Sequence, residues 1–251
     1  MPWAHLAEFN LHCAEQNYDT AASLLNEIDS DYSLLGNFQR IIELHEHLQG
    51  KISDPWLSGI AAGIVCKAHV LAEQGEFDQA VELYHKGIAI ADKIENIQYQ
   101  IEALLGLASV YLYTGNLEAA RLNAELAHNY NYQKNNHNAL TLLGVIALLQ
   151  GDKTYSKEAF ESAILTSNLL LSHSNKNYNA LDARGLALCG LALCEENTNY
   201  IPDAISAYNA ARSITRGTGI VGRNMRLFDK LANADTNGLL VEVGRAVKKL
   251  E

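Results

Sequence analysis

Apolar residues recur at intervals of three and four along most of the chain, separated by short polar stretches that often contain glycine. This spacing places apolar side chains on one face of a helix. Between Ile64 and Ala127 the same pattern occurs twice with an offset of 40 residues. The first copy comprises Ile64, Ala68, Leu71, Gly75, Phe77, Ala80, Tyr84 and Gly87, and the second comprises Leu104, Ala108, Tyr111, Gly115, Leu117, Ala120, Ala124 and Ala127. Each copy predicts a helix, a tight turn and a second helix.

Small residues occur where the two helices of each predicted pair should cross. Ala68 with Ala80, and Ala108 with Ala120, would let the two backbones approach closely. The glycine between them supplies the left-handed backbone conformation that ends the first helix. Each pair is therefore predicted to close into a compact hairpin.

Similar patterns extend in both directions from the two copies. Further helices are predicted over residues 3–16, 18–28, 38–48, 54–73, 138–150, 155–172, 181–194, 202–216, 221–232 and 238–250, with a brief turn of helix over 31–35. Asp54 and Pro55 form a good helix start, because Asp54 can accept from free amides and Pro55 needs no donor at the first position. Residues 173–179 are polar and predict a loop.

The two copies resemble tetratricopeptide repeats, in which an apolar helix leads to a turn glycine and then to alternating aromatic residues and alanines. Leu71, Gly87 and Ala124 depart from that pattern. The resemblance implies an all-α fold, a right-handed α-solenoid of about five helical hairpins, each covering a face of its neighbour. We expect the repeat array over residues 1–220 and one or two capping helices over 221–251.

Two runs, 31–45 and 48–57, resemble the entry to the repeat region of bacterial STAND-type signalling NTPases, and residues 186–232 are similar to the end of such regions. The resemblance implies a ligand-sensing regulatory arm whose NTPase module lies elsewhere, and we expect Met1 to begin a fragment of a longer protein. Two alternatives stay open: a free-standing scaffold or adaptor, and a receptor for a small molecule or peptide.

Composition narrows the choice of partners and compartment. The 19 Lys and Arg against 29 Asp and Glu give a formal net charge of −10, which opposes nucleic acid and anionic lipid. No long charge-free apolar run and no signal peptide is evident, so we expect a cytoplasmic protein that binds neither nucleic acid nor membrane. The four cysteines lack CxxC spacing and predict buried thiols.

The sequence offers no constellation for catalysis, so we expect a protein that is not an enzyme and uses no cofactor or metal. It contains neither GxxxxGK[ST] nor a GxGxxG that follows a strand. His45 and His47 are two residues apart and point to different faces of a helix. Ser109, Cys66 and Cys189 lie in predicted helices without a neighbouring base.

A concave groove is therefore the candidate site, lined in the resembled family by the first helix of each hairpin. The eight candidate binding residues are His69, Glu73, Glu102, Leu105, Ser109, Tyr113, Asn138 and Thr141. Val65, Ala72, Leu112, Val145 and Leu148 lie at the other matching positions, and Leu186, Cys189 and Leu193 follow in the last hairpin. The groove mixes apolar and polar groups and lacks the cluster of Lys, Arg and Asn that resembles a carboxylate clamp. We expect a protein or peptide ligand here, and self-association through exposed hairpins stays open.

Overall fold

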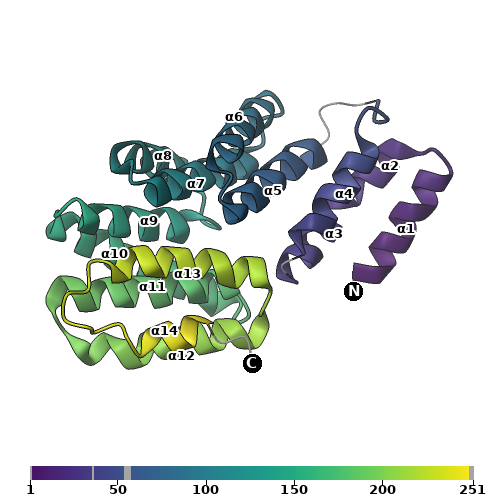
Figure 1. Cartoon of the computed structure of the whole chain (residues 1–251). Helices are drawn as coiled ribbons and strands as arrows, with labels where there is room; N and C mark the ends of the chain where they lie inside the picture. Colours follow the sequence, from purple (N-terminus) through teal and green to yellow (C-terminus); the bar gives the residue numbers. More distant parts are fainter. Residues whose placement is uncertain (1, 36, 54–57, 249–251) are drawn as a thin grey trace. The chain divides into compact units, whose positions relative to one another are not determined.

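The computed structural model describes residues 2–35, 37–53 and 58–248, and within these ranges all regular structure is helical (Figure 1). The helices are α1 (Pro2–Ala14), α2 (Tyr18–Ser23), α3 (Leu25–Leu34), α4 (Phe38–Leu48), α5 (Ser58–Gln74), α6 (Phe77–Lys93), α7 (Ile97–Thr114), α8 (Leu117–Asn129), α9 (Asn136–Leu149), α10 (Lys153–His173), α11 (Tyr178–Glu195), the 3-10 turn η1 (Thr198–Tyr200), α12 (Ile201–Ile214), α13 (Thr218–Ala232) and α14 (Val243–Lys248). The predicted all-α class of consecutively packed hairpins is confirmed. Within these described ranges, no helix is long and apolar enough to cross a membrane.

The chain divides into two compact units. Unit 1 comprises Met1–Gly106 with Gly217–Ile220, and unit 2 comprises Leu107–Arg216 with Val221–Glu251. The division falls inside α7 and again near the start of α13, so both helices contribute to both units.

In unit 1, the α5–α6 hairpin has the geometry that its sequence predicts. Gly75 adopts a φ of 85° at the turn, a conformation that glycine reaches without steric cost. Ala68 and Ala80 are fully buried. The ring of Tyr84 packs against Gly106, where any Cβ would overlap it. This contact lets α6 and the first part of α7 approach closely.

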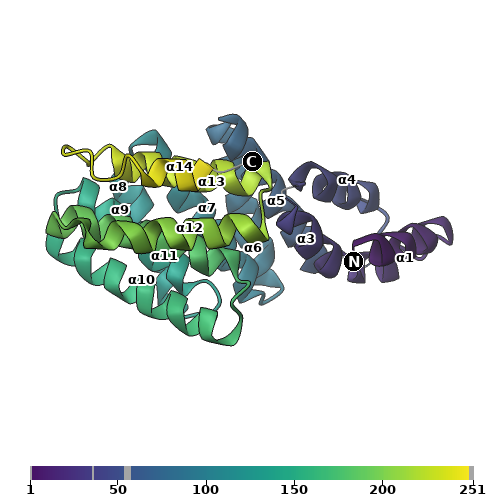
Figure 2. The same ribbon diagram turned by 90° about the horizontal axis from the view of Figure 1, so that it is seen from below.

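Unit 2 contains successive antiparallel helices whose starts are capped by side chains. The Oδ1 atoms of Asn116, Asp152 and Asn177 accept from the backbone amides of residues 119, 155 and 180, each at 3.1 Å. Such caps satisfy amides that have no partner within the helix. Figure 2 shows α10, α11 and α12 following one another in this unit.

The ring of Phe160 packs at the place where three helices of unit 2 meet. It lies on α10, is fully buried, and packs against Gly144 of α9 and Gly190 of α11. Neither glycine has room for a Cβ beside the ring. The small residues at these positions are therefore required by the close approach of α9, α10 and α11.

The N-terminal part of the chain differs from the prediction at two points. The helix expected over 18–28 ends at Ser23, and α3 runs unbroken from Leu25 to Leu34, replacing the brief turn expected over 31–35. A buried contact stabilises α3 in this position, because Asp29 lies 2.8 Å from His45 of α4. The predicted start at Asp54 and Pro55 lies outside the described residues.

The C-terminal part also differs in detail. The helix predicted over 202–216 ends earlier, at Ile214, and α13 begins at Thr218 rather than at residue 221, so that Gly219 lies in its first turn. Within 238–248, the described part of the range predicted over 238–250, only Val243–Lys248 is helical. Before α14, Asp235 accepts from the amides of Leu239 and Leu240 at 3.0 and 2.8 Å. These bonds compete with helix formation and hold a loop instead.

We predict that His137 makes unit 2 sensitive to acid. The side chain is 1% exposed, and neither ring nitrogen has a partner within the described part of the chain. Burial lowers its pKa from the ordinary 6.5 to about 4. Between these values the unfolded chain binds more protons than the folded chain. The free energy of unfolding should therefore fall as pH drops through this window, by about 2.5 kcal/mol between pH 7.5 and 4.5.

Denaturant titrations at the two pH values measure this effect. His137→Leu should lose about 2.5 kcal/mol less stability on acidification than wild type. The exposed His85→Gln serves as the control and should behave like wild type. Equal losses in wild type and His137→Leu would contradict the prediction.

We also predict opposite effects for alanine at two helical glycines. Gly190→Ala would press a methyl group into the Phe160 ring and should lower the free energy of unfolding by about 1–3 kcal/mol. Gly222, on α13, has no heavy atom of the described structure within 4 Å of an added Cβ, so alanine there should add up to about 1 kcal/mol. Thermal and denaturant unfolding of both variants checks the sign, and a neutral Gly190→Ala would contradict the packing.

Candidate functional site

Four of the eight candidate binding residues lie in unit 1, and all four are partly exposed. They are His69 and Glu73 on α5, and Glu102 and Leu105 on α7. Val65, Ala72 and Leu112, which were also predicted to line the groove, are buried. The Nδ1 atom of His69 lies 2.7 Å from the hydroxyl of Tyr84, and the two rings meet edge to face. Glu102 accepts from Gln98 at 3.0 Å. The side chains of His69 and Glu102 are therefore both hydrogen-bonded to neighbours within unit 1.

The other four residues lie in unit 2, and they differ in accessibility. Ser109, Tyr113 and Asn138 are half-buried. Thr141 is 4% exposed, and its hydroxyl donates to the backbone carbonyl of His137 at 2.7 Å. Thr141 was predicted to face the groove, but its side chain is not accessible to a partner in this structure. The binding role of the other seven residues stays a prediction.

Helix α11 presents its inward positions as one buried stripe. Asp182, Leu186, Cys189 and Leu193 recur at steps of four, three and four, so they lie along one face. None of them is more than 8% exposed. Burial raises the pKa of the Cys189 thiol, and the carboxylate of Asp235 adds to the shift. The thiol is therefore protonated and inert as a nucleophile.

The C-terminal segment, which we define as residues 221–248, covers this stripe. Near one end of α11, Asn224 of α13 donates to Asp182 at 2.9 Å. Near the other end, Leu193 and the loop 234–239 line the same cavity of about 70 Å³. Figure 1 shows α13 beside α11. The inward face of α11 is thus occupied by the chain itself.

Contacts to α7 and α9 extend the covered surface. The ammonium group of Lys230 donates to the backbone carbonyl of Tyr113 at 3.0 Å. This carbonyl belongs to the last turn of α7, where the helix dipole favours a cation. Leu148 of α9 lines the cavity beside Leu193. Tyr113, Leu148 and Leu193 are all predicted groove positions, so the C-terminal segment meets the groove on three successive hairpins.

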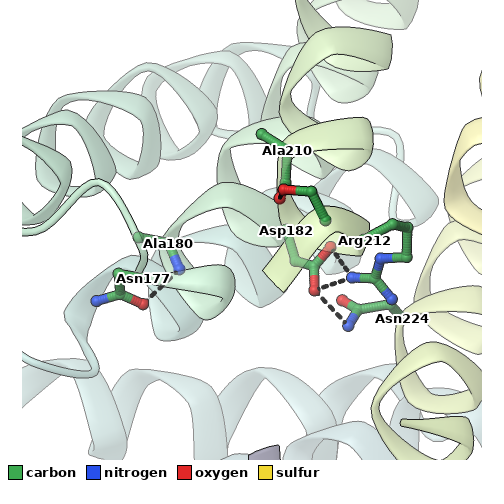
Figure 3. Close-up of polar contacts among 7 residues, drawn as sticks. Asn177, Ala180, Asp182, Ala210, Arg212 and Asn224 are labelled. Carbon is green, nitrogen blue, oxygen red and sulfur yellow. Dashed lines mark hydrogen bonds and ion pairs between the residues drawn. The ribbon is translucent and has the colours of Figure 1, made fainter. Parts of the chain in front are cut away.

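A buried ion pair anchors this arrangement. Figure 3 shows the carboxylate of Asp182 on α11 pointing toward both the guanidinium of Arg212 on α12 and the amide of Asn224 on α13. The Asp182 and Arg212 side chains are 3% and 1% exposed. Desolvation raises the pKa of Asp182, which the positive charge of Arg212 partly offsets. One carboxylate therefore joins three helices.

Sequence reasoning missed Asp182, Asn224 and Lys230. A signal for Asp182 was present, because it is the one acidic residue inside the predicted helix 181–194, which is rich in Ala and Leu. A charge in such a stretch requires a partner when it is buried. Asn224 and Lys230 carried no comparable signal, since both occur on an amphipathic helix where polar residues are ordinary.

We predict that Asp182→Ala strongly destabilises the fold. It leaves the Arg212 charge buried without its partner, which typically costs about 3–5 kcal/mol. Lys157→Ala is the matched control, because Lys157 pairs with Glu195 at 2.8 Å on the surface and exposed pairs contribute little to stability. Denaturant unfolding compares the two variants, and similar losses would show that the Asp182 pair is not the anchor.

Comparisons with known proteins bear on the repeat region. Residues 59–131 match the family model of the tetratricopeptide repeat. The crystal structure of a tetratricopeptide repeat protein from Parabacteroides merdae ATCC 43184 is similar at 16% identity and a TM-score of 0.41, covering 91% of this chain and 98% of that chain. These values are too low to transfer a function. No curated protein matches the chain. The family match and the observed hairpins support a tetratricopeptide repeat array, a fold that generally binds proteins or peptides and is generally non-catalytic.

Proposed function

We propose that the chain is a non-catalytic module that binds a protein or peptide on the inward-facing surface of its helical hairpins. The observation that carries the proposal is the position of α13, an amphipathic helix of the chain itself whose Lys230 donates to the backbone carbonyl of Tyr113, a predicted groove position of unit 2. A surface that accepts one helix through apolar burial and a few polar contacts has the chemistry to accept another.

The described residues give little support to a catalytic or small-molecule function. Among them, no group of three or more His, Cys, Asp or Glu side chains could hold a metal ion. The cavity beside Leu148 and Leu193 has a volume of about 70 Å³, well below the several hundred Å³ or more, roughly 300–1,000, of typical ligand pockets. This cavity is therefore too small for a ligand of the size that such pockets bind.

The finer form of the proposal is that this module is the ligand-sensing arm of a STAND-type signalling NTPase. Its support is the resemblance of residues 31–45 and 48–57 to the entry of such arms. A longer reading frame with an upstream GxxxxGK[ST] motif would agree with this role. A natural gene that encodes only this chain would favour the free-standing scaffold.

A peptide-display selection on the purified chain tests the proposed function. We expect enriched peptides whose affinity falls about tenfold or more when Leu105, a predicted groove residue, is changed to Ser. Leu122→Ser is the matched control, because Leu122 lies on the second helix of its hairpin and is 58% exposed, and it should leave binding unchanged. Failure to enrich peptides, or equal sensitivity to both substitutions, would contradict the proposal.

A further inference from the structure

Helix α13 has the pattern of a helix bound in a groove. Val221, Asn224, Phe228 and Leu231 recur at steps of three, four and three, so they share one face. The three apolar members are at most 5% exposed. Phe228 meets the ring of Tyr208 on α12 edge to face. Apolar anchors at this spacing are typical of helix-in-groove recognition.

The remaining faces of α13 are basic and only partly buried. Arg223, Arg226 and Lys230 carry positive charge against the single carboxylate of Asp229, and all three cations are partly exposed. The surface below is complementary, since it offers the carboxylate of Asp182 and the carbonyl end of α7. The whole chain carries a formal net charge of −10. The electrostatics thus favour a cationic helix on this surface.

Two polar contacts of α13 in unit 2, those of Asn224 and Lys230, are exchangeable. Asn224 donates to a carboxylate that keeps Arg212 as its partner when Asn224 leaves. Lys230 donates to a carbonyl at a helix end, which water can reach when the ammonium group departs. Loss of α13 therefore leaves no buried charge without a partner. The buried ion pair belongs to α11 and α12, which stay together.

We propose that the surface of unit 2 formed by α7, α11 and α12 is a docking site for an amphipathic, basic helix of a partner protein, and that α13 is its internal occupant. This inference rests on the proposed function and deepens it by naming the partner class. A partner helix must compete with α13. The apparent affinity for the partner is therefore lower than the intrinsic affinity, because only chains in which α13 has left the surface can bind. Weakening the seat of α13 should raise that affinity.

The test uses a fluorescein-labelled synthetic peptide with the sequence of residues 218–232 and the full chain. The variant Asn224→Ala with Lys230→Ala removes both polar contacts from the tethered helix, whereas the free peptide keeps them. We expect this variant to bind the peptide about tenfold more tightly than wild type, because more surface is available. Asp229→Ala, an exposed position on the same helix, is the matched control and should bind as wild type does.

Each other outcome overturns the inference in a distinct way. Equal affinity of wild type and double variant would show that α13 does not compete for the surface. No binding to either protein, with circular dichroism confirming folded chains, would show that the surface accepts no helix in trans. Dimers formed by exchange of α13, detected by light scattering, would assign the surface to a second copy. In all three cases the display selection still decides the proposed function independently.

Hydrogen exchange of the wild-type chain provides a measurement that needs no variant. A seated but displaceable helix opens without global unfolding. The amides of α13 should therefore exchange at least about tenfold faster than those of α11 and α12. Saturation with the 218–232 peptide should leave α11 protected and speed exchange in the tethered α13. Exchange of α13 together with α11 and α12 would identify it as a permanent part of the core and overturn the inference.

Discussion

A helical hairpin buries one face against its neighbours and leaves its inward face to be covered by something else, and this constraint organises unit 2. The inward stripe of α11 is mostly apolar and is never more than 8% exposed. Leaving it in water would cost about 25 cal/mol for each Å² of apolar surface. The C-terminal segment removes that cost by lying over the stripe, so Asn224 and Lys230 are coupled to helices far earlier in the sequence.

Asp182 shows how a polar group can specify this cover. Apolar contacts alone would let an amphipathic helix settle in several registers, because the hydrophobic effect has no direction. A buried carboxylate that needs hydrogen bonds restricts the choice. Arg212 neutralises its charge, and Asn224 accounts for a further contact. The ion pair thereby holds α11 against α12. The remaining acceptor sites of Asp182 also favour the register of α13 in which the side-chain amide of Asn224 can donate to them.

The sequence allowed the hairpins to be predicted well because their determinants are local. Gly75, Gly115 and Gly151 all take a φ of 85° at the turns, and the alanines at the crossings are buried. The break near Leu24 was missed, since tertiary packing of α3 through Asp29 and His45 overrides the local pattern. The cover on α11 was also missed, because contacts between residues 42 or 117 positions apart leave no periodic trace in a single sequence.

The predicted groove therefore needs to be considered by unit rather than as one continuous surface. Thr141 and the α11 stripe satisfy the spacing rule for groove positions, yet they are interior residues, because spacing identifies a face and not what lies over it. The apolar and charged residues of the covering helix α13 give information on what lies over that face, which the spacing of residues does not contain. Under the proposed docking role, its apolar anchors and three cations indicate the chemistry of the partner helix. In a repeat fold, where shape is generic and recognition depends on a few side chains, an internal occupant is direct information about the external one.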